Sequence, residues 1–297
     1  MHKLLILFLS LCTSTVSFAT LTPEQTLVFD SYRDTLNIWS DTLINSSFEQ
    51  NRTIASYRMI KTLKTALQKP GSFEYTFDSL PSISVQRAED GSFRIFTWQC
   101  KLGNEDYRYY GVIQTGGKNP KLFPLVDYSE FYQNPDSVIV DADRWVGCLY
   151  YNIIKVKSGK KVYYTLFGWD DNNSMSSKKY IDILWFDKTG TPQFGYPLFK
   201  QEKGKSPTRI ILEYKNEASL SLNYFADEKK IFFDHTVPLS GIEEGFYFNY
   251  VPDGTMDGYE WKNGLWEFIN NIPYEKLEDG EAPISPHQPT PKLYQPK

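Results

Sequence analysis

Two acidic loops carry the side chains of this sequence that are best suited to chemistry. The first, residues 169–173, ends a run of alternating aromatic residues, and the second, residues 252–258, joins two further runs of that kind. Two carboxylates that face each other across a cleft can serve as the acid and base of a glycosidase. An aromatic ring beside them offers an apolar face to a sugar. The candidate binding residues in and beside these loops are Trp169, Asp170, Asp171, Asp253, Asp257 and Trp261.

The same loops are candidates for a calcium site. Carboxylate and amide oxygens are the ligands that Ca²⁺ prefers, and calcium is available outside the cell. Neither loop has the ligand spacing of an EF-hand, however, and Asp-Gly and Asn-Asn pairs are common turn residues. Calcium is therefore the one cofactor that the sequence leaves open, and no residue is assigned a catalytic role.

Several common catalytic arrangements are excluded by composition and spacing. Beyond residue 19 the chain has only His235 and His287, too few for a His-rich zinc site or an HExxH protease. No GxSxG nucleophile motif occurs. Residues 204–206 resemble the end of a phosphate-binding loop, but Phe199 stands where that loop requires glycine. Metalloproteases, the commonest serine hydrolases and P-loop nucleotide binding are thus disfavoured.

Asp234 and His235 are the only ordered carboxylate–histidine neighbours that the sequence predicts. They lie in an alternating run, and neighbours on a strand point to opposite faces, so they cannot pair with each other. Each needs a partner that is distant in sequence. A single histidine with no candidate nucleophile rarely marks a catalytic site. We therefore expect one of these two side chains to be exposed and the other to be a hydrogen-bonded core group.

Aromatic residues are unusually frequent, with 21 Tyr, 20 Phe and 7 Trp. Rings at the mouth of a β-scaffold can stack on sugars, whereas rings on both faces of layered sheets fill the cores between them. The second interpretation is favoured, because large rings are the normal filling of β-cores. The tyrosines that occur in runs are Tyr107, Tyr109, Tyr110, Tyr150, Tyr151, Tyr163 and Tyr164.

The first nineteen residues have the features of a cleavable signal peptide. Lys3 precedes the apolar run 4–9, and Ser17 and Ala19 place small residues at the −3 and −1 positions of a cleavage site. The apolar run is too short to span a bilayer as a stable helix, which disfavours a membrane anchor. We therefore expect an exported protein that is periplasmic, associated with the outer membrane or secreted, with no transmembrane span after cleavage.

The charge of the chain disfavours nucleic-acid binding. Removal of Lys3 with the signal peptide leaves 31 basic and 36 acidic residues, a net charge of −5. Affinity for nucleic acid comes largely from clustered Lys and Arg that neutralise phosphates, and the sequence has no such cluster.

Cys100 and Cys148 remain after cleavage, and the sequence leaves open whether they form a disulfide or are two small buried side chains.

Residues 20–70 are expected to form a helical hairpin. Residues 22–25 have the form of a capping box with Pro at the first helical position. A second helix is expected from a capping box at Ser46 and Glu49 to about Leu67. The side chains expected to face inward are Phe29, Tyr32, Leu36, Trp39 and Leu43 in the first helix and Tyr57, Ile60, Leu63 and Leu67 in the second.

Residues 71–274 are expected to form an antiparallel β domain. Hydrophobicity alternates along its segments, and short polar turns such as Asp90-Gly91 and Asn263-Gly264 separate them. Turns this short join antiparallel neighbours, because a parallel crossover needs a dozen or more residues. The sequence therefore predicts a mainly β fold, an antiparallel meander arranged like a propeller or as layered sheets. The Pro-rich residues 275–297 are expected to be a disordered tail.

Four stretches near the C-terminus carry a resemblance to a known group of proteins. They are residues 232–235, 251–254, 257–259 and 263–266, and the Gly168-Trp169-Asp170 stretch is similar too. On these motifs the chain resembles uncharacterised exported proteins of Bacteroidota-type bacteria. The resemblance implies a location in the envelope of a diderm bacterium or outside it, and it implies no activity.

These observations together predict an exported, non-catalytic envelope protein. Its partner would be a protein or a surface glycan of the cell envelope, bound through exposed aromatic side chains and the acidic loops. The alternative is a glycan-active hydrolase that uses paired carboxylates from residues 170–171 and 253–257.

Overall fold

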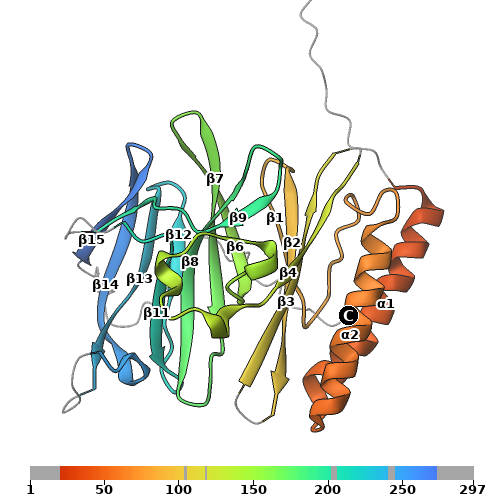
Figure 1. The fold of residues 1–297 in the computed structure, drawn as a ribbon, viewed down its shortest axis with the longest axis horizontal. Helices are drawn as coiled ribbons and strands as arrows, with labels where there is room; N and C mark the ends of the chain where they lie inside the picture. The colour runs from red at the N-terminus through yellow and green to blue at the C-terminus, as the bar shows by residue number, and fades with distance from the viewer. Residues whose placement is uncertain (1–20, 104–105, 118, 202–205, 240–244, 273–297) are drawn as a thin grey trace, which may run out of the picture.

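The computed structural model describes residues 21–103, 106–117, 119–201, 206–239 and 245–272. The predicted signal peptide, residues 1–19, and the predicted tail, residues 275–297, lie outside these ranges. The described chain is mainly β: two N-terminal helices are followed by antiparallel sheets, as the sequence predicts (Figure 1). No described helix is both long and apolar enough to cross a membrane.

The helical hairpin consists of α1 (Pro23–Asn45) and α2 (Glu49–Leu67). The predicted capping box of α1 is formed: Thr22 accepts a hydrogen bond from the Gln25 backbone, and Gln25 accepts one from the Thr22 backbone. The second capping box is not formed. Phe48 is the N-cap of α2, and Glu49 accepts a hydrogen bond from Gly103 instead.

The buried face of α2 differs from the predicted one at Tyr57, which is exposed. Met59, Leu63 and Leu67 face the core, and Arg52 in the first turn of α2 is also buried. The Arg52 guanidinium donates to the carbonyl oxygens of Ser46 and Lys101. These hydrogen bonds offset the free-energy cost of burying the charge.

Sheet 1 pairs four antiparallel strands in sequence order. They are β1 (Ser84–Arg87), β2 (Phe93–Leu102), β3 (Asp106–Thr115) and β4 (Leu122–Val126). The connection from β4 to the next sheet contains two short 3-10 helices, η1 (Ser129–Phe131) and η2 (Pro135–Ser137). A third, η3 (Ala142–Arg144), follows at the start of sheet 2.

Sheet 2 is antiparallel and has its longest strand near the middle. Its strands are β5 (Val140–Asp141), β6 (Leu149–Ser158), β7 (Lys161–Asp170), β8 (Ser176–Phe186), β9 (Pro192–Phe194) and β11 (Ile210–Lys215). On the side away from β7, β8 pairs with β9 near its end and with β11 near its start. β11 returns to sheet 2 after the chain has visited the third sheet, which a simple meander does not predict.

Sheet 3 has the order β10-β15-β14-β13-β12. Its strands are β10 (Phe199–Lys200), β12 (Leu222–Phe225), β13 (Lys230–Pro238), β14 (Tyr250–Lys262) and β15 (Leu265–Ile272), with η4 (Tyr247–Asn249) before β14. The pair β10–β15 is parallel, an exception to the predicted antiparallel pairing.

The helices and sheets are stacked as layers, in the order hairpin, sheet 1, sheet 2 and sheet 3 (Figure 1). One apolar cluster lies at each interface, so both faces of sheets 1 and 2 are buried over much of their area. This explains the aromatic runs. Tyr109, Tyr150, Tyr163 and Tyr164 are buried between layers, as the core-filling interpretation predicts.

The two cysteines are free and buried. Cys100 belongs to the cluster between the hairpin and sheet 1, and Cys148 belongs to the cluster between sheets 1 and 2. Sheet 1 therefore separates the two thiols, and the disulfide that the sequence left open is not formed in this structure. Burial raises the pKa of both thiols, which makes them poor nucleophiles.

Candidate functional site

A polar cavity of about 940 Å³ lies between sheet 2 and the segment 129–137. Its floor comes from β8 and β11, where Tyr180 pairs with Ile211 and Lys178 pairs with Glu213. Directly paired residues share a face of a sheet, so these four side chains point the same way. The described residues that line the cavity include Glu130, Tyr132, Gln133, Asn134, Asp136, Asp170, Asn172, Gln201, Arg209 and Tyr247.

Asp170 is held at the edge of this cavity by three hydrogen bonds. It accepts from the hydroxyl of Tyr109 at 2.7 Å, the hydroxyl of Tyr180 at 3.2 Å and the backbone of Asn172 at 2.7 Å. Burial raises the pKa of Asp170, although each of these hydrogen bonds opposes the shift. A carboxylate with this many donors anchors the turn that follows β7, and its oxygens are already engaged.

A second set of polar contacts continues from this turn along the floor. Asn172 accepts from the Lys178 ammonium and donates to the Ser176 hydroxyl, each at 2.7 Å. Ser176 in turn donates to Glu213 at 2.6 Å. The turn requires a positive φ at Asn172, where φ is 50°, and Asn tolerates this conformation well. Lys178 and Glu213 are thereby fixed with part of each side chain exposed.

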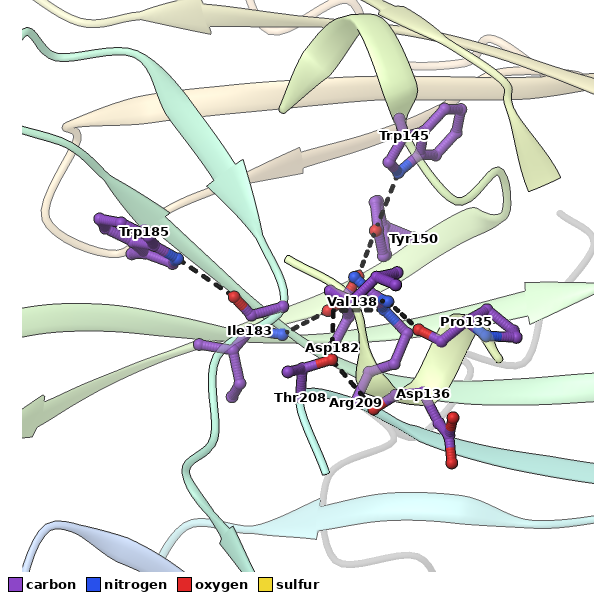
Figure 2. Close-up of polar contacts among 11 residues, drawn as sticks. Pro135, Asp136, Val138, Trp145, Tyr150, Asp182, Ile183, Trp185, Thr208 and Arg209 are labelled. Atoms are coloured by element: carbon purple, nitrogen blue, oxygen red, sulfur yellow. Dashed lines mark hydrogen bonds and ion pairs between the residues drawn. The ribbon is translucent and has the colours of Figure 1, made fainter. Parts of the chain in front are cut away.

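The far wall of the cavity is fixed by a buried ion pair (Figure 2). Nε of Arg209 lies 3.2 Å from Oδ1 of Asp182, and the two side chains are 0% and 2% exposed. Asp182 also accepts from the Tyr150 hydroxyl at 3.2 Å, and Tyr150 accepts from the indole of Trp145 at 3.0 Å. The aspartate is thus surrounded by donors, which a buried charge requires.

The same arginine holds the cavity wall. Nη1 of Arg209 donates to the carbonyl oxygens of Pro135 and Val138, the latter at 3.1 Å. Thr208 adds a backbone and a hydroxyl hydrogen bond to the Asp136 carbonyl, at 2.8 and 2.9 Å (Figure 2). Residues 135–138 are therefore tied through their backbone carbonyls to Thr208 and Arg209, which immediately precede β11, and we call this set of contacts the Arg209 clamp.

Gly195 makes room for the clamp. Its φ is +84°, and a Cβ there would lie 2.5 Å from the Val138 carbonyl oxygen and 2.8 Å from Nη2 of Arg209. Both the backbone conformation and the close approach require glycine.

Of the six binding residues that the sequence predicts, Asp170 alone is among the described residues that line the cavity. Trp169 is the neighbour of Asp170 on β7 and points to the opposite face of sheet 2. Asp171 lies beside the Tyr107 hydroxyl. Burial, and then the hydrogen bond with Asp171, raises the pKa of Tyr107 to about 12.

The other predicted residues lie on sheet 3. Asp253 accepts from the backbone and hydroxyl of Thr255, an ordinary Asx turn. Asp257 lies 2.7 Å from Nδ1 of His235, across a bulge between β13 and β14. Trp261 packs against Trp266 with ring centroids 4.9 Å apart. Residues 252–258, predicted as a loop between two strands, lie instead within β14 of sheet 3, whereas Asp170 ends β7 of sheet 2. The two acidic stretches thus belong to different sheets, although the hydrolase alternative draws carboxylates from both.

His235 and Asp234 both find partners that are distant in sequence, as the strand geometry requires. His235 pairs with Asp257, and Asp234 accepts a hydrogen bond from the Ser221 backbone at 2.6 Å. The His235 side chain is half-exposed, so the pair lies at the surface of sheet 3.

Four residues of the cavity and its wall, Lys178, Asp182, Arg209 and Glu213, were not predicted from the sequence. Asp182 did carry a signal, because it interrupts the apolar run Ile181-Asp182-Ile183-Leu184, and a charge within a buried strand needs a buried partner. Lys178 and Glu213 had no such signal in the sequence, because charged side chains on a strand usually indicate a solvated face.

Among the residues that the structure describes, no three or more His, Cys, Asp or Glu side chains group as metal ligands do. Calcium remains a prediction from the sequence. No known family model matches the chain, and no curated protein or solved structure matches it at a significant level. The chemistry of the cavity is therefore the basis on which a function is assigned.

Proposed function

We propose that this chain is an exported, non-catalytic protein of the cell envelope that binds a glycan in the polar cavity. The observation that carries the proposal is the composition of the lining. Lysine, glutamate and amide side chains offer donors and acceptors for sugar hydroxyls, and Tyr132 and Tyr247 add rings beside them. A few convergent polar groups with aromatic neighbours are typical of sites for small polar ligands.

The shape of the site favours a glycan over a protein partner. Its volume of about 940 Å³ falls in the range of small-molecule sites, roughly 300–1,000 Å³. A stable protein–protein contact instead needs a patch of about 800 Å² on each partner. A short oligosaccharide is therefore the better match to this concave, polar surface.

The hydrogen bonding of the carboxylates favours binding over catalysis. Asp170 accepts three hydrogen bonds, and Glu213 accepts one from Ser176. A glycosidase needs one carboxyl that can release a proton to the substrate and a second that can attack or activate water. The raised pKa of Asp170 is the one feature that suits a general acid. Release of reducing sugar from a bound glycan would establish the hydrolase alternative.

The proposal is tested with a panel of bacterial envelope glycans, followed by calorimetric titration of any glycan that binds. Lys178→Met should weaken binding about tenfold or more, because a hydrogen bond from a charged donor contributes about 1.5–3 kcal/mol. The matched control is Lys179→Met. Lys179 is the next residue on β8, faces the other side of sheet 2 and lies over the ring of Tyr151. Equal affinities for the two variants, or no glycan bound by the panel, would refute the proposal.

A further inference from the structure

A second hollow, the apolar groove, lies on the helix side of sheet 1 and has a volume of about 760 Å³. It runs between α2 and the edge of the sheet formed by β3 and β4. Tyr110 pairs with Val126 and Val112 with Pro124, so these side chains share one face of the sheet. The described apolar residues that line the groove include Ile60, Leu63, Val112, Leu122, Pro124, Val126 and Phe131.

The far end of the groove exposes large apolar side chains. Val126 is 47% exposed and Phe131 is 60% exposed, and the Phe131 ring lies 4.1 Å from that of Tyr128, centroid to centroid. Contiguous exposed apolar side chains beside a concave surface indicate a binding site. The polar groups at the rim include Lys64, which is exposed, and Arg108, which lies 4.0 Å from Glu130.

The apolar groove and the polar cavity meet at η1. Glu130 lines both. Its neighbours divide between the two: Tyr128 and Phe131 line the groove, whereas Ser129 and Tyr132 line the polar cavity. Tyr109 makes a second connection, because it lines the groove and its hydroxyl binds Asp170 of the cavity. One short element thus separates a polar binding site from an apolar one.

We propose that the ligand is an amphiphile of the glycolipid type, with its sugar head in the polar cavity and a single alkyl chain in the apolar groove. This inference rests on the function proposed above and adds the second half of the ligand. The alkyl chain is favoured over an apolar peptide because the groove is lined by side-chain faces of α2, β3 and β4. A peptide strand would instead pair with the backbone of a strand at a sheet edge.

The test uses hexyl, heptyl and octyl glucoside below their micelle concentrations, titrated calorimetrically into the protein. Affinity should rise about threefold to fourfold with each methylene, which corresponds to about 0.8 kcal/mol per buried CH₂. The double variant Val126→Ser/Phe131→Ser should lose this dependence on chain length. Both side chains are exposed, so the fold should persist. The matched control is Ile38→Ser, which removes an exposed apolar side chain of α1 outside the groove.

The outcomes separate the two proposals. If octyl glucoside does not bind, if affinity does not depend on chain length, or if the dependence survives in the groove variant, the inference is overturned. Lys178→Met should weaken every member of the series by the same factor. A flat series that still responds to Lys178→Met would leave the glycan site standing without the alkyl site. A rising series that ignores Lys178→Met would instead refute the glycan site.

Discussion

The Arg209–Asp182 pair gives the sharpest prediction about this fold. The two side chains are 0% and 2% exposed, so removal of either leaves a charge that no water can reach. In Arg209→Met, Asp182 keeps only the donors Tyr150 and the backbone of Ile183. In Asp182→Leu, the guanidinium keeps only carbonyl acceptors. Each single variant should lose about 3–5 kcal/mol of unfolding free energy, the usual effect of breaking a buried pair.

The double variant Asp182→Leu/Arg209→Met separates the charge interaction from the packing. It removes both charges, but the Pro135 carbonyl loses its donor and the Tyr150 hydroxyl loses its acceptor, at about 1–3 kcal/mol each, whereas Val138 still accepts from Thr208. Its loss should therefore be about 2–6 kcal/mol, below the sum of the single losses, which is about 6–10 kcal/mol. The assay is guanidinium unfolding followed by tryptophan fluorescence.

An exposed ion pair supplies the control. Arg144 and Asp141 lie 3.1 Å apart, and the Arg144 side chain is 63% exposed. Arg144→Met should cost less than about 1 kcal/mol. Additive losses in the double variant at the buried pair, or single losses as small as that of the control, would refute the reasoning.

Four further predictions follow from single features of the structure. Gly195→Ala should lose about 2–4 kcal/mol of unfolding free energy through strain and overlap, whereas Gly190→Ala, with open space around it, should lose about 1 kcal/mol. In the chain that begins at residue 20, the thiols of Cys100 and Cys148 should not react with a thiol reagent until the protein unfolds, and then both should react. A disulfide between them would leave no thiol to react even after unfolding. Burial raises the pKa of Asp90, but serine and lysine hydrogen bonds outweigh it and lower the pKa to about 2. Since the ordinary value is 3.8, the free-energy difference between wild type and Asp90→Asn should be constant above about pH 4 and shrink toward pH 2. A calcium site requires that Ca²⁺ raise the melting temperature and EDTA reverse the rise; an unchanged temperature would exclude it.

The sequence predicts the elements of this fold well because their signals are local. The capping box at Thr22 and the helical spacing of Phe29, Leu36 and Leu43 involve residues a few positions apart. Tyr57 was placed wrongly because it fits the spacing of α2 on a neighbouring face, and only the position of sheet 1 decides which face is covered. The return of β11 to pair with β8 is a long-range choice that no local pattern encodes.

The candidate site was predicted less well, because it is assembled from residues far apart in sequence. Asp170 was identified from its acidic loop, yet it lines the cavity as an anchored group beside Lys178 and Glu213. Asp253 was identified by the same reasoning and lies on sheet 3 in a turn. Linear spacing cannot distinguish these outcomes, since both stretches contain ordinary turn residues, although Asp170 ends β7 and Asp253 lies within β14.

The buried charge at Arg209 has a physical explanation in the segment that it holds. Residues 129–138 connect sheets 1 and 2, and their Tyr132 and Val138 side chains pack against the apolar cluster between these sheets. Their carbonyl oxygens can be fixed by a buried donor, and Arg209 supplies two hydrogen bonds to them from one guanidinium group. Asp182 is then needed to balance the charge. The ion pair therefore positions residues 135–138, which form one wall of the polar cavity, and this role accounts for a buried pair of a kind that often adds little to stability by itself.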